Sequence, residues 1–257
     1  MKKLSIVIPV YNEKNTVEDL LNKVYDLKIK DIEKEIVIVE DNSKDGTREI
    51  VKSFCKKHPD CKLILRKNPR GKGYAVRVGL KKATGDILAI QDADLEYDVN
   101  DYHKLLRAFT EGQAKFVLGS RHLNENGDKV HMIRKFHGKE RLYAYLMNFG
   151  GIFLHKFFNV LYGTKISDPT TMYKLFTRDL YEKVELEGSY FELDWEIVAK
   201  FVRLGYFPKE IPIKYESRGL GEGKKVRLRR DVTKWLGTII KFRFLPKSKI
   251  LKTQNGK

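Results

Sequence analysis

The sequence predicts an open α/β fold in which a mostly parallel sheet is flanked by helices. Short runs of Ile, Val and Leu recur along the first half of the chain and are continuous rather than alternating, as in strands buried on both faces. Their starts lie about 25–30 residues apart, which leaves room for the right-handed crossovers that join parallel strands. The strands are expected at residues 4–9, 36–39, 63–65, 87–90 and 116–118.

Helical apolar patterns lie between these strands. The clearest begins at Val17, where apolar residues recur at helical spacing, and Asn15 with Glu18 has the pattern of a capping box at its start. Shorter stripes of the same kind predict helices around residues 50–54 and 105–109. Alternating strands and helices are typical of a sheet whose ligands bind beyond the carboxyl ends of the strands.

Three further helices and one strand are expected in the second half of the chain. A polar stretch with three histidines after residue 121 predicts a loop. Residues 209–215 predict an edge strand, because Pro212 has no N–H to donate to a neighbouring strand. The helices are expected at residues 139–162, 193–204 and 232–243.

Charge is concentrated at the C-terminal end of the sequence. Of the formal net charge of +17, residues 224–257 carry +11, with 12 Lys or Arg and one Asp. A segment of this kind suits an anionic membrane surface, a phosphorylated substrate or nucleic acid. No window reaches about 18 uninterrupted apolar residues, so no spanning helix is expected. Two cysteines provide no disulfide framework, which fits a reducing cytosol.

Acidic residues follow three of the predicted strands. Glu13 follows the first, Asp41 the second, and Asp92 with Asp94 the fourth. Because the carboxyl ends of parallel strands meet at one edge, these carboxylates would repel one another unless a cation or a hydrogen-bonding ligand joined them. Two aspartates that are two residues apart at a strand exit are hard oxygen ligands, suited to Mg²⁺ or Mn²⁺ shared with a diphosphate.

Short motifs at and beyond these strand ends form a set that extends over nearly the whole chain. They are Ile8-Pro9-Val10-Tyr11-Asn12-Glu13, Glu40-Asp41-Asn42-Ser43, Gly71-Lys72-Gly73, Asp92-Ala93-Asp94-Leu95-Glu96, Gly119-Ser120-Arg121, Ser167-Asp168-Pro169, Glu210-Ile211-Pro212-Ile213, Arg218 and Gly223-Lys224-Lys225. Together they resemble the family 2 glycosyltransferases of the GT-A fold, and more narrowly the branch of dolichol-phosphate mannose synthases and polyprenyl-phosphate glucosyltransferases. A sugar nucleotidyltransferase would instead need a Gly-rich, Arg-containing loop directly after the first strand.

The resemblance implies an inverting, metal-dependent transfer of mannose or glucose from a nucleotide sugar, GDP-mannose or UDP-glucose, to a polyprenyl (dolichyl) phosphate. It assigns the metal, Mg²⁺ or Mn²⁺, to Asp92, Asp94 and Glu96, although mannose-type synthases often have Gln at the position of Glu96. The residues that it assigns to the nucleotide are Pro9, Tyr11, Glu13, Val39, Asp41, Asp92 and Ala93.

The resemblance also implies an acceptor side. Arg121, Arg218 and Lys224 match positions that face phosphate groups, and catalysis is expected from Asp94, Asp194 and Arg218. Two interpretations of Asp194 stay open: a general base, or a helix N-terminal carboxylate that interacts with the helix dipole. The alternative function follows from the first of them, namely the same donor chemistry with a glycan or protein hydroxyl as acceptor.

The expected organisation is a single GT-A type domain that ends in a basic amphipathic helix. Residues 1–121 are expected to bind the nucleotide sugar and residues 122–222 the acceptor. In the basic segment, residues 223–257, an apolar stripe begins at Trp235 and Leu236 and is suited to the domain core or to a membrane interface. An anionic membrane is the favoured partner, ahead of a solvated surface, and nucleic acid ranks last. The expected location is cytoplasmic, peripherally bound to the cytoplasmic face of the membrane.

Overall fold

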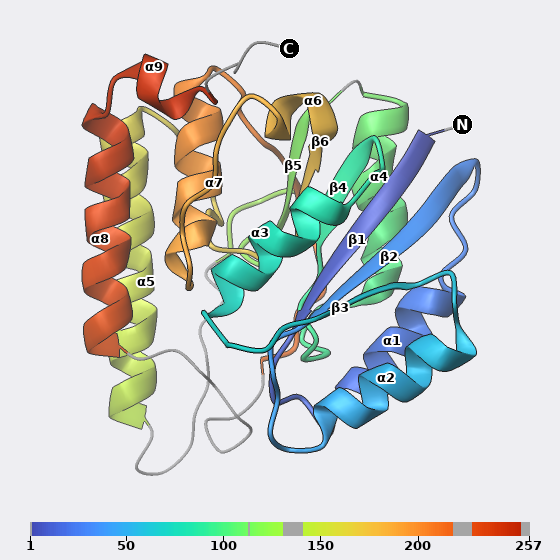
Figure 1. Ribbon diagram of the computed structural model, residues 1–257. Coiled ribbons are helices and arrows are strands. Elements are labelled where there is room, and N and C mark those ends of the chain that lie inside the picture. Colours follow the sequence, from blue (N-terminus) through green and yellow to red (C-terminus); the bar gives the residue numbers. More distant parts are fainter. Residues whose placement is uncertain (1, 113, 131–140, 218–227, 253–257) are drawn as a thin grey trace.

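The computed structural model describes residues 2–112, 114–130, 141–217 and 228–252. At its centre is a seven-stranded sheet with the order β3-β2-β1-β4-β6-β5-β7 (Figure 1). In this sheet β6 runs antiparallel to both of its neighbours, β4 and β5, and all the other recorded strand pairs are parallel. The predicted mostly parallel α/β fold is therefore confirmed.

Each strand expected from the sequence is present, and one further strand was not predicted. The edge strand β7 pairs with β5 alone, as expected for a strand that carries Pro212. The unpredicted strand is β6, which inserts between β4 and β5. The bounds are β1 (Lys2–Val10), β2 (Ile32–Glu40), β3 (Lys62–Leu65), β4 (Ile87–Ile90), β5 (Phe116–Ser120), β6 (Lys174–Thr177) and β7 (Lys209–Pro212).

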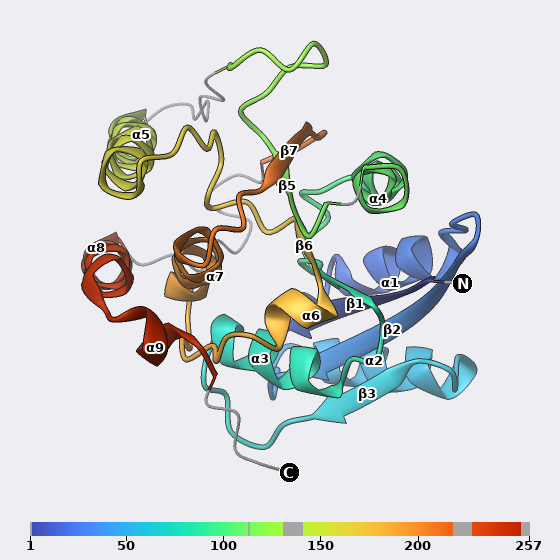
Figure 2. The same ribbon diagram turned by 90° about the horizontal axis from the view of Figure 1, so that it is seen from above.

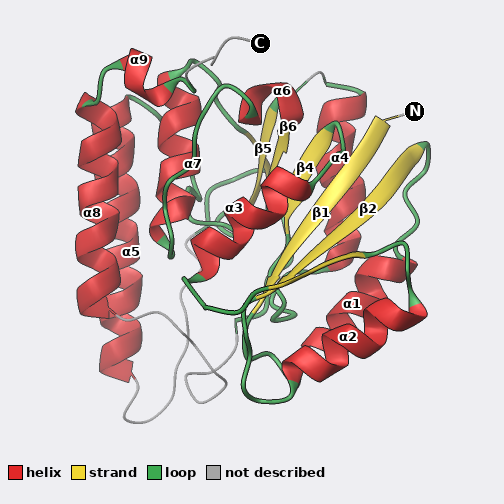
Figure 3. Ribbon diagram, viewed as in Figure 1, coloured by secondary structure: helices red, strands yellow, loops and turns green. Residues whose placement is uncertain are grey.

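Helices cover both faces of the sheet. Seen from above, α3, α6 and α7 lie on one side and α1 and α4 on the other, with α5 and α8 outside α7 (Figure 2). Loops join these helices to the strands in alternation through the first half of the chain (Figure 3). The bounds are α1 (Val17–Asp26), α2 (Thr47–Lys57), α3 (Lys72–Lys82), the 3-10 helix η1 (Val99–Asp101), α4 (Tyr102–Thr110), α5 (Arg141–Tyr162), α6 (Arg178–Tyr181), α7 (Glu192–Arg203), α8 (Leu228–Phe244) and α9 (Lys247–Ile250).

The start of α1 differs from the prediction. Thr16 occupies the N-cap position and no side chain caps the helix, so the predicted capping box of Asn15 and Glu18 is wrong. The Thr16 hydroxyl donates instead to the carbonyl oxygen of Ala93, at 2.8 Å. A tertiary contact has taken the place of a local cap, and it ties the start of α1 to the segment that follows β4.

Glycines allow α3 to pack closely against its surroundings. A Cβ on Gly79 would lie 2.3 Å from Cγ1 of Val7 on β1, and one on Gly73 would lie 2.5 Å from the carbonyl oxygen of Tyr190. Side chains at these two positions are therefore excluded by the sheet on one side and by the segment before α7 on the other. The close approach fixes the first turn of α3 beside the start of α7.

The last long helix, α8, packs on α7. Ile239 and Phe242 are 0% and 2% exposed, whereas Ile240, from the predicted apolar stripe, is 45% exposed. Trp235 and Leu236 are half-buried against the core. Lys224 and residues 218–227 as a whole lie outside the described part of the chain. Among the described residues, no helix is both long and apolar enough to cross a membrane.

Candidate active site

The carboxyl ends of β1, β2 and β4 meet at one edge of the sheet, and the backbone just beyond each of them is unusual. Asn12, Asn42 and Leu95 have φ values of 49°, 61° and 62°. Non-glycine residues seldom adopt this left-handed conformation, and such residues cluster at functional sites, at a cost of about 1–3 kcal/mol each. The edge predicted to carry the chemistry is thus also where the backbone is constrained.

A lysine holds the first of the predicted metal-binding aspartates. Lys72 Nζ lies 2.6 Å from Asp92 Oδ1, and the two side chains are 23% and 11% exposed. Lys72 is the first residue of α3, so the Gly-Lys-Gly motif lies at the start of a helix. Burial lowers the pKa of Lys72, but the charges of Asp92 and Asp194 outweigh it and the net pKa is raised. The ammonium group therefore stays charged at neutral pH.

The three predicted metal ligands are not gathered around one point. The Tyr215 hydroxyl donates to the carboxylate of Glu96, and Asp94 Oδ1 accepts from the Glu96 backbone N–H at 3.2 Å. No three acidic, His or Cys side chains in the described ranges form a group that could hold a metal ion. The third ligand expected from the sequence is engaged by a tyrosine, and a preformed three-carboxylate site is not observed.

The donor set nevertheless fits a hard divalent cation. Asp92 and Asp94 offer only oxygen ligands, and Asp92 already holds a cationic group in the form of the Lys72 ammonium. Mg²⁺ is usually bound through one or two carboxylates together with substrate phosphates, which supply the remaining ligands. Two aspartates are enough for such a site, and Tyr215 engages one of the two carboxylate oxygens of Glu96.

The acid at the end of β2 pairs with an arginine that was not predicted from the sequence as a site residue. Asp41 is buried, and Arg66 Nη1 lies 2.5 Å from its Oδ1. The Arg66 guanidinium also lies 4.3 Å from the centre of the Tyr74 ring. Burial raises the pKa of Asp41, and Arg66 only partly opposes this. Arg66 directly follows β3, so the strand-end rule that found the acids could have found this base as well.

The other predicted nucleotide-binding residues differ in how they face the site. Tyr11 is 38% exposed at the end of β1, so its ring is accessible. Glu13 accepts a hydrogen bond from the Thr16 hydroxyl at 3.1 Å. Pro9, Val39 and Ala93 are buried, and the Val39 side chain packs toward α3. Any contact of Val39 with a ligand would have to come from its backbone.

Asp194 lies at the same edge as Asp92, although 102 residues separate them in the sequence. It is in the first turn of α7 and pairs with Lys174 of β6, whose Nζ is 3.3 Å from Asp194 Oδ1. Lys174 is fully buried. Burial raises the pKa of Asp194, against the lowering effect of Lys174 and Lys72. The structure thus brings together Asp92, Lys72, Asp194 and Lys174 with alternating charges.

Arg121 forms a buried ion pair with Asp168. Its Nε and Nη2 lie 2.7 and 2.8 Å from the two carboxylate oxygens of Asp168, which is 0% exposed. Its guanidinium also lies 5.1 Å from the centre of the Tyr215 ring. Two of its nitrogens thus face Asp168, and the expectation that Arg121 also faces a phosphate group stays a prediction. Arg218 lies outside the described residues, as does Lys224.

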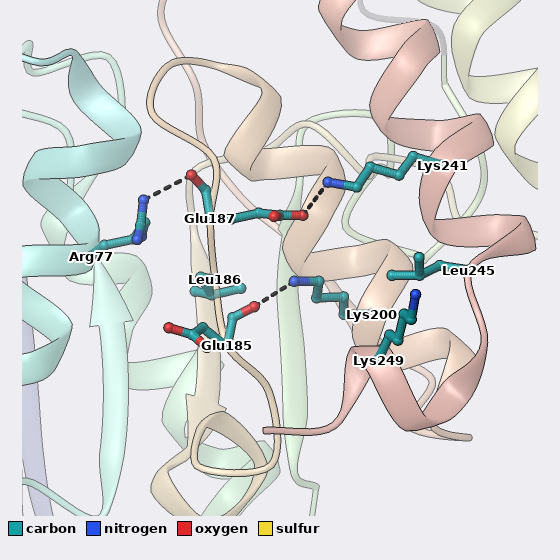
Figure 4. A pocket seen from close by; sticks show the side chains of 8 residues that line it. All are labelled: Arg77, Glu185, Leu186, Glu187, Lys200, Lys241, Leu245 and Lys249. Atoms are coloured by element: carbon teal, nitrogen blue, oxygen red, sulfur yellow. Dashed lines mark hydrogen bonds and ion pairs between the residues drawn. The ribbon is translucent and has the colours of Figure 1, made fainter. Parts of the chain in front are cut away.

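A pocket of about 400 Å³ lies beside α3, away from the strand ends (Figure 4). Arg77 Nη1 donates to the carbonyl oxygen of Glu187 at 2.7 Å, and Lys241 Nζ pairs with its carboxylate at 2.6 Å. None of the predicted site residues lines it, so the pocket is not the candidate site. Its contacts tie the segment before α7 to α3 and α8. The lining residues are Arg77, Glu185, Leu186, Glu187, Lys200, Lys241, Leu245 and Lys249.

The chain has the features of the GT-A fold class. Its sheet is mostly parallel with one antiparallel strand, acidic residues follow the strands at one edge, and Asp194 on a later helix adds a further acid there. The chain belongs to glycosyl transferase family 2, whose family model matches residues 5–185.

The chain resembles three characterised relatives over most of its length. It is 32% identical over 227 residues to a dolichol-phosphate mannosyltransferase of Pyrococcus furiosus, a match that covers 86% of the chain and 59% of the relative. It is 29% identical to a dolichyl-phosphate beta-glucosyltransferase of Trichomonas vaginalis, with 88% and 68% covered. It is 28% identical to a low-salt glycan biosynthesis hexosyltransferase of Haloferax volcanii, with 84% and 48% covered. The chain therefore spans between about half and two thirds of the length of these relatives.

Solved structures of the same fold confirm the architecture. A glucosyl-3-phosphoglycerate synthase of Mycobacterium tuberculosis, in complex with Mn²⁺, UDP and glucosyl-3-phosphoglycerate, matches with a TM-score of 0.66 at 17% identity, over 96% of this chain and 82% of that one. A mannosyl-3-phosphoglycerate synthase of Rubrobacter xylanophilus matches with a TM-score of 0.66 at 19% identity, over 93% and 73%.

Proposed function

We propose that the chain is an inverting, metal-dependent glycosyltransferase that moves mannose or glucose from a nucleotide sugar to a polyprenyl (dolichyl) phosphate. The observation that carries the proposal is the cluster of Asp92, Lys72, Asp194 and Lys174 at the carboxyl edge of the sheet. It places cations between the expected donor site and the start of α7. The names of two relatives, a dolichol-phosphate mannosyltransferase and a dolichyl-phosphate beta-glucosyltransferase, support the choice of acceptor.

On the donor side, residues 1–121 would bind GDP-mannose or UDP-glucose. Tyr11 offers an exposed ring for the base, and Glu13 and Asp41 offer carboxylate oxygens that accept hydrogen bonds from base N–H groups or ribose hydroxyls. Asp92 and Asp94 would hold Mg²⁺ or Mn²⁺ on the diphosphate, with the backbones of Pro9, Val39 and Ala93 beside it. When bound, the ion would act as a Lewis acid that stabilises charge on the leaving diphosphate.

In the transfer step, the bond between the sugar C1 and the diphosphate oxygen breaks while an acceptor oxygen forms a new bond to C1 from the opposite face. Negative charge grows on the departing diphosphate, and the Lys72 ammonium stabilises that charge from the start of α3. A phosphate acceptor is already an anion, so its oxygen needs no base. It needs cationic guides, and two are proposed for that role: Arg218 in the acceptor half, residues 122–222, and Lys224 at the start of the basic segment, residues 223–257.

Arg121 would contribute to the acceptor side by a different route from the one expected. Because Asp168 holds two of its nitrogens, it is proposed to fix the shape of this region rather than to grip a phosphate alone. His155 on α5 extends the network, with Nε2 3.2 Å from the Thr170 hydroxyl that also accepts from Arg121. Burial lowers the pKa of His155 to about 4, so it stays neutral at pH 7.

A second candidate function, with a glycan or protein hydroxyl as acceptor, is favoured by the raised pKa of Asp194. A carboxylate with a raised pKa is a better general base near neutral pH. Its contribution would be lost as the pH falls through that raised pKa, because only the ionised form accepts a proton. The two candidates share the donor side and differ in what they require of Asp194.

One experiment tests the proposed acceptor and separates these candidates. The chain is incubated with radiolabelled GDP-mannose or UDP-glucose, Mn²⁺ and a short polyprenyl phosphate, and the product is extracted into organic solvent. We expect labelled lipid, and we expect Asp194→Asn to change its rate by less than about threefold. The same variant should lose about 100-fold or more of any transfer to an alcohol acceptor, such as a glycan hydroxyl, because that reaction needs a general base. A loss of that size in lipid transfer, in a variant that thermal unfolding shows to be folded, would contradict a phosphate acceptor that needs no base. No labelled lipid from either donor would contradict the lipid acceptor.

The outer surface of α5 and α8 supports peripheral binding at the cytoplasmic face of an anionic membrane. Phe149, Phe153 and Val160 are 64%, 54% and 85% exposed on α5. The helix α8 lies beside α5 (Figure 1). On α8, Ile240 and Phe244 are 45% and 72% exposed. Exposed cations flank this apolar surface, and each would add about 1 kcal/mol near an anionic bilayer. They are Lys156, Arg243 and Lys247.

We expect the double variant Phe153→Ser, Phe244→Ser to reduce sedimentation with phosphatidylglycerol vesicles by at least about tenfold. The variant removes two exposed rings that would be buried in the bilayer interface on binding. Leu65→Ser is the matched control, since Leu65 is 41% exposed at the end of β3, across the molecule from α8. Equal losses in both proteins, or no binding of the unaltered chain to these vesicles, would contradict the proposed membrane surface.

A further inference from the structure

The expected metal site contains a cation that belongs to the protein itself. The predicted roles in the donor site fall on carboxylates, but the nearest group to Asp92 Oδ1 is the Lys72 ammonium, at 2.6 Å. The same ammonium is close enough to Asp94 and Asp194 for their charges to stabilise it. Lys72 therefore pairs with one proposed metal ligand, Asp92, while the charges of the other, Asp94, and of Asp194 also act on its ammonium group.

The backbone of Lys72 is held firmly, while its side chain keeps access to solvent. A Cβ on Gly71 would lie 2.5 Å from the carbonyl oxygen of Ser189, so the segment before α7 packs tightly on this turn. The Tyr74 N–H donates to the same oxygen at 3.0 Å. The Lys72 ammonium lies 5.5 Å from the centre of the Phe191 ring, and the side chain is 23% exposed. A fixed backbone with a long, partly exposed side chain allows the charged end to exchange partners.

An ammonium and a divalent ion cannot both share Asp92 without cost. A metal ligated by Asp92 would lie about 2.0–2.2 Å from its oxygen, only a few ångströms from the ammonium now held there. Two positive charges that are about 4 Å apart repel each other strongly at an intermediate effective dielectric, and the repulsion is larger when one of the charges is double. A diphosphate changes this balance, because it brings several negative charges that are able to bind both cations at once.

We propose that Lys72 is a displaceable counter-cation of the donor site. It holds Asp92 while the site is empty, which weakens binding of the metal alone, and it moves to a diphosphate oxygen when nucleotide and metal arrive together. The chain would thereby favour loading of the metal–nucleotide complex over loading of free metal. This inference rests on the proposed function, because it takes Asp92 as a ligand of the metal.

The test is a comparison of two affinities in the folded protein, measured without turnover. Mn²⁺ binding is followed by electron paramagnetic resonance, first alone and then with UDP or GDP, for the unaltered chain and for Lys72→Met. We expect Lys72→Met to bind free Mn²⁺ at least about fivefold more tightly and to bind the nucleoside diphosphate with Mn²⁺ about tenfold more weakly. These opposite shifts are the signature of a competing cation that also serves the diphosphate. A purely structural lysine would weaken both.

Two matched variants and one separate outcome complete the design. Lys81→Met removes an exposed lysine from the last turn of the same helix and should change neither affinity. Lys72→Arg keeps the positive charge, so it should keep the weak binding of free Mn²⁺ and the tighter binding of Mn²⁺ with the nucleoside diphosphate that are expected of the unaltered chain. Shifts of the same sign in Lys72→Met, or unchanged affinities, would overturn the inference. If the unaltered chain binds no Mn²⁺ even with UDP or GDP, the proposed function fails instead.

Discussion

Replacement of Asp92 or Asp94 by asparagine should lower the rate of sugar transfer by about a hundredfold to a thousandfold. Each variant removes one of the two charges proposed to hold the metal on the leaving diphosphate, and loss of such transition-state stabilisation typically costs two to three orders of magnitude. The measurement is the organic-phase assay with saturating donor and Mn²⁺. Binding of Mn²⁺ in the presence of UDP or GDP should weaken in parallel.

The control for this prediction is Asp60→Asn. Asp60 is an exposed aspartate just before β3, at the opposite edge of the sheet from the candidate site, and its replacement should leave the rate within about twofold of the original. Thermal unfolding of all three variants would show whether a lost rate reflects a lost fold. A correctly folded Asp92→Asn protein with full activity would rule out this carboxylate as a metal ligand.

Asp168→Asn should have the largest effect on stability. Asp168 is fully buried and accepts two hydrogen bonds from the Arg121 guanidinium and one from the Arg121 backbone N–H, so the variant leaves a buried guanidinium without its counter-charge. Removal of one partner of a buried pair typically costs about 3–5 kcal/mol. For a chain of this size that corresponds to a fall in Tm of roughly 6–20 °C. Differential scanning calorimetry at neutral pH is the direct measurement.

Asp179→Asn is the matched control, because Asp179 also pairs with a cation, Lys115, but the two side chains are exposed. The exposed fractions are 53% for Asp179 and 48% for Lys115. A surface pair contributes about 0–1 kcal/mol, so the Tm should barely change. Burial alone would raise the pKa of Asp168, but the Arg121 charge and hydrogen bonds hold it well below its usual range. The stabilisation is therefore present above the ordinary pKa of an aspartate and is lost only in strong acid. Equal Tm changes in the two variants would contradict the buried-pair account.

The parts of the fold that were predictable are those with local apolar patterns. Continuous Ile and Val runs gave the core strands, and Pro212 placed β7 at an edge. The strand β6 was missed because it is short and begins with Lys174, a charged residue whose complete burial depends on two partners, Asp194 on α7 and the carbonyl oxygen of Thr171. The helix α3 was missed because it contains Gly73 and Gly79, which disfavour a helix locally and are required here by close packing.

The candidate site was predictable to a similar degree. The rule that ligands bind beyond strand ends found Asp41, Asp92 and Asp94, because these residues directly follow apolar runs. Because it was applied to acids alone, it did not find Arg66, although this residue directly follows β3. Nor did the Gly71-Lys72-Gly73 motif show that Lys72 pairs with Asp92, since an ion pair between distant residues leaves no pattern in one sequence. The engagement of Glu96 by Tyr215 was hidden for the same reason.

The central claim is that one divalent ion links Asp92 and Asp94 to the diphosphate of the donor. A crystal grown with Mn²⁺ and either UDP or GDP tests it most directly, with data collected at the manganese absorption edge. We expect one anomalous peak within ligand distance of both carboxylates and of two diphosphate oxygens. A bound nucleotide with no anomalous peak between it and these two aspartates would contradict the account.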